Sequence, residues 1–133
     1  MLSIHFFVAV VIITIGATFI QWFFTGFLFH KYQALTPLTW RKESGRSYAA
    51  STLLTLCFAF MFMTIFSLWK FKYGAINTIT GIEFSAICWL AFFIPAEIGS
   101  AIYVKYAPMF VVGKCISALV EYILAGVIAA KMV

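Results

Sequence analysis

Residues 4–29 have the sequence IHFFVAVVIITIGATFIQWFFTGFLF, an apolar run that contains no Asp, Glu, Lys or Arg. A helix of about 20 apolar residues crosses the hydrocarbon core of a bilayer, so this stretch predicts a transmembrane helix. The run continues well past the small residues around Ala17 and lacks a basic segment before it. These two features favour a retained signal anchor over a cleaved signal peptide.

Three further apolar runs follow, and together the four occupy almost the whole chain. Of the 133 residues, 65% are hydrophobic and 10% are charged, whereas soluble domains are about half apolar and a quarter charged. We predict an all-α, polytopic membrane protein in which a single transmembrane domain, residues 1–133, forms a four-helix bundle. The predicted helices span residues 4–29, 47–69, 75–103 and 108–130.

Small and polar residues recur at helical spacing in the first two predicted helices. Because residues three or four apart share a helix face, we expect both sets to turn toward neighbouring helices and the phenylalanines to turn toward lipid. The sets are Thr14, Thr18, Gln21 and Thr25 in the first helix, and Ser51, Thr55 and Ala59 in the second.

The basic residues lie singly or in pairs near the ends of the apolar runs. Five of them, Lys31, Arg41, Lys42, Arg46 and Lys105, belong to one side of the membrane, and three, Lys70, Lys72 and Lys131, belong to the other. The excess predicts that the first side is cytoplasmic and that both termini face outward. Because these residues form no clustered face, we do not expect a nucleic-acid partner.

Four ionisable residues lie inside the apolar runs: Glu83, Glu97, Lys114 and Glu121. A charge at the bilayer centre costs about 2.5–3.5 kcal/mol even on the lenient insertion scale, so each needs a partner, a proton, water or a position near the interface. The third and fourth helices are joined by a very short turn at Lys105 and Tyr106, and depth matching across this hairpin places Glu97 opposite Lys114. We predict an intramembrane ion pair between them; the alternative is that Lys114 extends to the headgroups alone.

Two neighbouring features refine the hairpin. Pro95 removes a backbone hydrogen bond and frees the carbonyl of Ala91, so it is predicted to kink the helix beside Glu97. Glu121 belongs to a row of small residues, Gly113, Ser117, Ala125 and Ala129. This row predicts that Glu121 turns inward, where it is protonated, hydrogen-bonded to a neighbouring helix or shared across a subunit interface.

Depth also relates the first two helices to this hairpin. Gln21 and Thr55 lie at about the depth of Lys114. The candidate binding site is therefore a layer of Gln21, Thr55, Glu97 and Lys114, together with Glu121, which lies seven residues beyond Lys114 on nearly the same face of the helix. The layer either forms the floor of a small polar cavity or only joins the helices by hydrogen bonds. Glu83 lies nearer the other membrane face, within reach of Lys70 or Lys72.

Other kinds of site find little support. The three cysteines form no CxxC motif and have no metal-ligand spacing, so we predict no metal and no cofactor. His5 and His30 lie at opposite ends of one helix and cannot both ligate one haem iron. Since the chain has no Asp, a Ser-His-Asp triad cannot be assembled.

The stretch 23–31, FFTGFLFHK, and the closing segment 125–130, AGVIAA, carry a resemblance. In these segments, and in the order of its helices and loops, the chain resembles the small bacterial four-helix membrane family catalogued as domain of unknown function 1761. Gly26 stands where that family usually has Pro, and His30 where it usually has Gly. The resemblance implies a four-helix fold in a bacterial cytoplasmic membrane, and it implies no established activity or functional residue.

Two functions fit these observations. The first is a small transporter or ligand-binding protein, often a homo-oligomer, that uses Glu97, Lys114 and Glu121 as a protonatable site. The second is a non-catalytic accessory or scaffold subunit whose partners are the lipid bilayer and another membrane subunit. An intramembrane enzyme would depend on Glu97 beside Pro95 alone, so we do not favour it.

Overall fold

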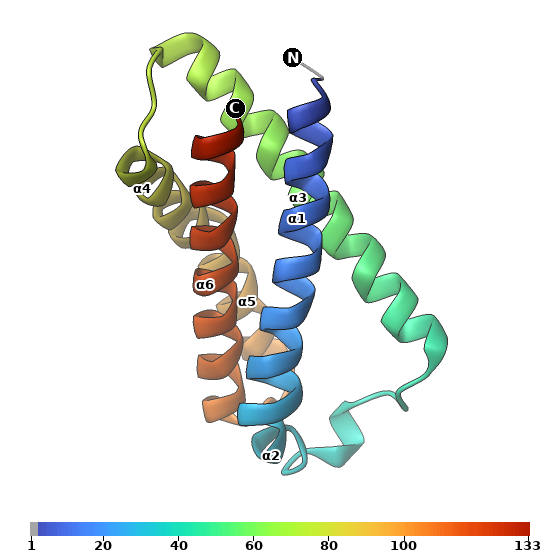
Figure 1. Cartoon of the computed structure of the whole chain (residues 1–133). Coiled ribbons are helices and arrows are strands. Elements are labelled where there is room, and N and C mark those ends of the chain that lie inside the picture. Colours follow the sequence, from blue (N-terminus) through green and yellow to red (C-terminus); the bar gives the residue numbers. More distant parts are fainter. Residues whose placement is uncertain (1–2) are drawn as a thin grey trace.

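The computed structural model describes residues 3–133, which form helices joined by short connections (Figure 1). The first membrane helix is α1, Ile4–Gln21, continued by the π-helix η1, Trp22–Leu28. The loop after it holds α2, His30–Gln33, and the 3-10 turn η2, Pro37–Thr39. The remaining elements are α3, Gly45–Tyr73; α4, Thr78–Cys88; the π-helix η3, Trp89–Phe93; α5, Ile94–Tyr103; and α6, Pro108–Met132.

Four helices are long and apolar enough to cross a membrane, and no strand occurs among residues 3–133. The predicted all-α, four-helix transmembrane fold is therefore confirmed. The spans are Ile4–Leu28, Gly45–Tyr73, Thr78–Tyr103 and Pro108–Met132.

Local caps explain where these boundaries differ from the prediction. The Ser44 hydroxyl accepts from the backbone of Ser47 and the Ser47 hydroxyl reaches back to Ser44, a capping box that starts α3 at Gly45 rather than 47. The helix ends at Gly74, which has the positive φ of 85° that only glycine adopts freely. Asn77 then caps the backbone N–H of Thr80, so the third helix begins at Thr78 rather than 75.

Helix α6 is the centre of the bundle and contacts α1, α3, α4 and α5 (Figure 1). The α4–α6 contact is close because Gly81 and Gly126 face each other, and a methyl group on either would overlap the backbone of the other. Small residues allow such an approach of two backbones in a membrane. The predicted antiparallel packing of the third and fourth helices is thus confirmed.

At the end of the bundle where α1 begins and α6 ends (Figure 1), the helices share an apolar core. Phe6 and Ile13 of α1 pack there with Met63 and Phe66 of α3. Ala125 and Ala129 of α6 complete the contact, and all six side chains are almost fully buried.

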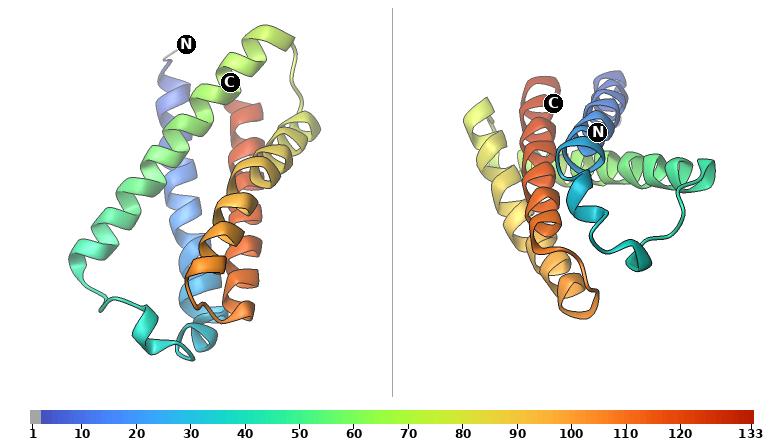
Figure 2. Two further views of the ribbon diagram at one scale, coloured as in Figure 1. Left: turned by 180° about the vertical axis from the view of Figure 1, so that it is seen from behind. Right: turned by 90° about the horizontal axis from the view of Figure 1, so that it is seen from below.

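The opposite end is open because α3 leans away from the other helices (Figures 1 and 2). With 29 residues, α3 is about 44 Å long, well above the roughly 30 Å of the hydrocarbon core, and a helix of this length fits by tilting. Residues 41–54, which include its first turns, are all exposed. The tilt therefore separates the start of α3 from α5 and α6.

Candidate functional site: a polar crevice at the open end

Two adjoining cavities lie where α3 diverges from η1 and α6. The inner cavity has a volume of about 530 Å³ and the outer cavity, toward the loop, about 640 Å³. Both are lined by Gln21, Thr25, Ser51 and Lys114, so they adjoin each other, and we call the two together the polar crevice. Small-molecule sites typically occupy about 300–1,000 Å³, so each part is large enough for a ligand.

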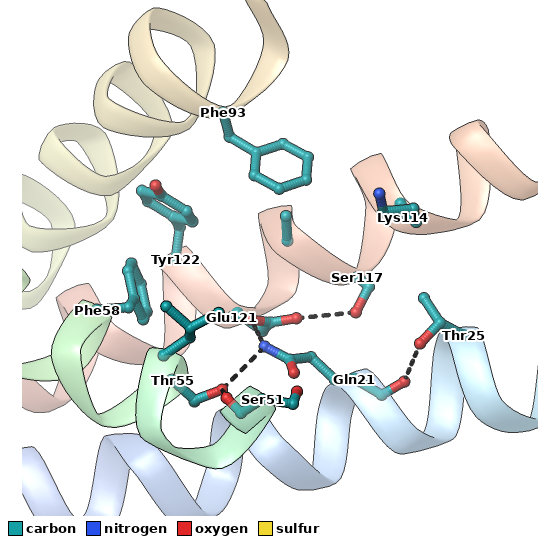
Figure 3. A pocket seen from close by; sticks show the side chains of 12 residues that line it. Gln21, Thr25, Ser51, Thr55, Phe58, Phe93, Lys114, Ser117, Glu121 and Tyr122 are labelled. Atoms are coloured by element: carbon teal, nitrogen blue, oxygen red, sulfur yellow. Dashed lines mark hydrogen bonds between the residues drawn. The ribbon is translucent and has the colours of Figure 1, made fainter. Parts of the chain in front are cut away.

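Glu121 lies on the floor of the inner cavity and binds two neighbours (Figure 3). Its Oε2 accepts a hydrogen bond of 2.9 Å from Nε2 of Gln21, and its Oε1 accepts one of 2.9 Å from the hydroxyl of Ser117. Nε2 of Gln21 also lies 3.4 Å from Oγ1 of Thr55, a long contact. Side chains of α1 and α6 thus meet at Glu121, which is 7% exposed, and Thr55 of α3 contacts the same Gln21 amide.

Helix packing explains why these residues meet. The row of small residues on α6 is buried as predicted, and Glu121 turns inward with it. Of the alternatives open for Glu121, the structure contains the hydrogen bond to a neighbouring helix. The ring of Phe29 packs against Gly113. This contact determines which residues of the first membrane helix lie level with which residues of α6.

The predicted Glu97–Lys114 ion pair is present, with 2.7 Å between Lys114 Nζ and Glu97 Oε1. The contact lacks the alignment of a hydrogen bond, so charge attraction holds it. The Lys114 ammonium also lies 5.3 Å from the centre of the Tyr106 ring, at the distance of a cation–π contact. Lys114 is therefore engaged by two partners from the α5–α6 hairpin and its turn.

The predicted single layer is wrong in one respect, because it divides into two groups. Gln21 and Thr55 gather around Glu121, whereas Glu97 pairs with Lys114. Lys114 lines both cavities, but Glu97 lines neither of them. The crevice thus separates a hydrogen-bonded floor from an ion pair at its side.

Both π-helices border the crevice. Gln21 immediately precedes η1, Thr25 lies within it, and Phe93 ends η3 beside the inner cavity. The helix predicted to kink at Pro95 contains the π-helix η3, which ends two residues before Pro95, and α5 begins at Ile94. Single π-turns in membrane helices are often found at functional sites.

Other expected contacts have mixed outcomes. In the first helix the hydroxyls of Thr14, Thr18 and Thr25 donate hydrogen bonds to carbonyls of their own helix. Of the four polar residues predicted to face neighbouring helices, Gln21 is the one whose side chain forms a hydrogen bond to another helix within residues 3–133. In α3, Thr55 and Ala59 are buried as expected, whereas Ser51 is exposed in the crevice.

Glu83 lies on the exposed face of α4, and no ion pair to Lys70 or Lys72 forms within residues 3–133. Lys70 instead donates a hydrogen bond to the backbone carbonyl of Val133. The expected contact of Glu83 with the neighbouring basic residues is therefore wrong.

The sequence interpretation missed the aromatic side of the inner cavity. Phe58, Phe93 and Tyr122 line it together with the polar side chains of Gln21, Ser51 and Thr55; Phe58 lies beside Thr55, and Phe93 lies across the cavity from it (Figure 3). With aromatic residues making up 20% of the chain, nothing in their spacing distinguishes these three. Ser117 was recognised only as a small residue, and its hydroxyl is a partner of Glu121.

The crevice carries more negative than positive charge. Glu43 lines the outer cavity and accepts a hydrogen bond of 2.6 Å from the Tyr48 hydroxyl, while Glu121 lies on the inner floor. Lys114 is the basic residue shared by both cavities, and Glu97 balances it. Within residues 3–133, no basic side chain forms an ion pair with Glu121, and no three His, Cys, Asp or Glu side chains gather as a metal site.

No known family model, curated protein or solved structure matches this chain. The resemblance to the family catalogued as domain of unknown function 1761 therefore stays a prediction. The candidate site rests on the geometry of the crevice.

Proposed function

We propose that this multi-pass membrane protein binds or transports a small molecule and that the polar crevice is its site. The observation that carries the proposal is the buried Glu121 carboxyl group on the floor of a cavity of about 530 Å³. A charged group within a membrane helix is costly, and such residues commonly face a ligand or ion pathway. A bundle that needed only rigidity would fill this space with apolar side chains.

The two groups of polar residues have different roles in this proposal. Glu97 and Lys114 hold α5 against α6 and keep one wall of the crevice in place. Gln21, Thr55, Ser117 and Glu121 present polar atoms to the ligand. The outer cavity adjoins the inner one on the side of the loop, which supports entry from that side.

The test uses adjacent leucines on α3. Leu54 lines the inner cavity, whereas Leu53 does not, and the two are 70% and 60% exposed. Native mass spectrometry of the chain, purified from its membrane in mild detergent, is expected to detect a co-purified small molecule. Leu54→Trp places a larger side chain at the cavity wall and should weaken or remove binding of this molecule, while Leu53→Trp should retain it.

A second assay measures transport. The full chain is reconstituted in vesicles of phosphatidylethanolamine and phosphatidylglycerol, and proton flux is followed with a trapped pH-sensitive dye. We expect flux that falls in Leu54→Trp, Glu121→Gln and Lys114→Met but not in Leu53→Trp. The absence of both a bound molecule and a flux that depends on Leu54 would overturn the proposal.

The second candidate function is a scaffold or accessory subunit. It is favoured by the start of α3, where residues 45–54 are all exposed. Another membrane subunit or a second copy of the chain would cover this segment. Isolation in mild detergent tests this role: a stoichiometric partner held by α3 supports it, and a lone monodisperse species contradicts it.

The proposal places the protein in a bacterial cytoplasmic membrane with both termini outside, as a member of the family it resembles. The excess of Lys and Arg on the loop side supports this orientation. In a variant without native cysteines, a thiol at Ser3 should react with an impermeant reagent added to intact cells, whereas a thiol at Lys42 should not. The reverse pattern would overturn the orientation.

A further inference from the structure

We propose that the ligand of the polar crevice is a lipophilic organic cation, held by the Glu121 carboxylate and the rings of Phe58, Phe93 and Tyr122. This inference rests on the proposed function and names its ligand class. The inner cavity joins a carboxyl group without a basic partner to an aromatic wall, and this pair of features fits a cation with an apolar body.

The first argument concerns the charge of Glu121. Its two oxygens accept hydrogen bonds of 2.9 Å from the neutral donors Gln21 and Ser117. Neutral donors orient a carboxylate but do not balance its charge, and each carboxylate oxygen can accept a further hydrogen bond. A bound cation would supply the missing charge in a region where an uncompensated charge is costly.

The second argument concerns the aromatic side chains that line the inner cavity. Tyr122 follows Glu121 on α6, and its ring packs against Phe58 of α3 with 4.9 Å between ring centres. Phe93 of η3 extends the aromatic surface above them (Figure 3). Cations are attracted to the faces of aromatic rings, and the attraction is strongest where water is excluded.

The third argument excludes an anionic ligand. Among residues 3–133, the one cation that lines the inner cavity is Lys114, and it is already paired with Glu97 at 2.7 Å and lies over Tyr106. An anion would have to displace Glu97 and also approach Glu121.

The experiment compares two probes of the same shape and opposite charge, tetraphenylphosphonium and tetraphenylborate. Equilibrium binding is measured on the full chain in mild detergent, with empty micelles as the blank. We expect saturable binding of the phosphonium and none of the borate. Glu121→Gln should weaken phosphonium binding about tenfold or more, because a buried charge pair is lost, and Phe93→Leu should weaken it by about 2- to 30-fold.

Glu83→Gln is the matched control, because it removes a carboxylate from the exposed face of α4 and outside both cavities. It should bind phosphonium as the parent chain does, and thermal unfolding confirms that each variant is folded. Equal binding of both probes, no binding of the phosphonium, or an unchanged affinity in both Glu121→Gln and Phe93→Leu would overturn the inference. The proposed function would survive such a result if a co-purified molecule that Leu54→Trp removes were neutral or anionic.

Discussion

The side-chain amide of Gln21 donates a 2.9 Å hydrogen bond to Glu121, which lies 100 residues later in the sequence. The bond joins the first membrane helix to the last one at the floor of the polar crevice. The same carboxyl group binds Ser117 of its own helix, so both of its oxygens are oriented. Glu121 is thus both a structural contact and the main polar group of the proposed site.

Replacing Gln21 by Leu should destabilise the bundle by about 1 kcal/mol, because Glu121 then loses a donor while it stays buried. Thermal unfolding in detergent, followed by circular dichroism, measures the loss. Thr18→Val is the control, since the Thr18 hydroxyl bonds to the Thr14 carbonyl of its own helix. Equal stability of the two variants would show that the bond to Glu121 contributes nothing.

The Glu97–Lys114 pair leads to a prediction about charge balance. Lys114→Met leaves Glu97, 7% exposed, without its counter-charge. We expect a loss of about 1–3 kcal/mol, below the 3–5 kcal/mol typical of a fully buried pair because Lys114 is partly exposed.

The double variant Glu97→Gln with Lys114→Met removes both charges and should recover most of that stability. The double-mutant cycle is measured by thermal unfolding in the same detergent. If the effects of the two substitutions simply add, the pair is not coupled and the prediction fails.

The sequence was sufficient for the Glu97–Lys114 pair because a short turn and a constant rise per residue determine which residues face each other in a hairpin. It was not sufficient for Gln21, which depth counting placed level with Lys114. Phe29 packs at Gly113, not at the start of α6. Gln21 lies eight residues before Phe29 and Glu121 lies eight residues after Gly113, so these two side chains are level.

The crevice itself could not be predicted for a related reason. Its width depends on the tilt of α3, and the tilt follows from a length of 29 residues. The sequence interpretation placed this helix at residues 47–69, short enough to stand upright. The additional turns come from the capping box at Ser44 and from the C-cap at Gly74, so two local features lengthen α3 at both ends.

The contact between Gly81 and Gly126 gives a prediction about helix approach. A methyl group at Gly126 would overlap the Ser85 hydroxyl and the Gly81 carbonyl, so Gly126→Ala should force α4 away from α6. We expect a loss of about 1–3 kcal/mol, as for other overpacked positions, or failure to fold.

Gly99→Ala is the control, because a methyl group there meets no atom within 4 Å. It should leave stability unchanged or raise it by up to about 1 kcal/mol, since alanine favours a helix more than glycine does. Fluorescence-detected size exclusion after heating compares the two variants. A Gly126→Ala chain as stable as Gly99→Ala would contradict the close packing of α4 on α6.

The last prediction concerns water in the crevice. In a variant without native cysteines, Ser51→Cys should react with a charged, impermeant thiol reagent because Ser51 lines both cavities. Ser85→Cys should not react, since Ser85 is fully buried, and Leu53→Cys should not react because it is exposed outside the crevice, where lipid surrounds it. A thiolate forms in water and not in hydrocarbon, so the reaction distinguishes a wet crevice from a lipid-filled one. Labelling of Leu53→Cys as fast as Ser51→Cys, or of neither, would show that the space between α3 and α6 is not a path for water.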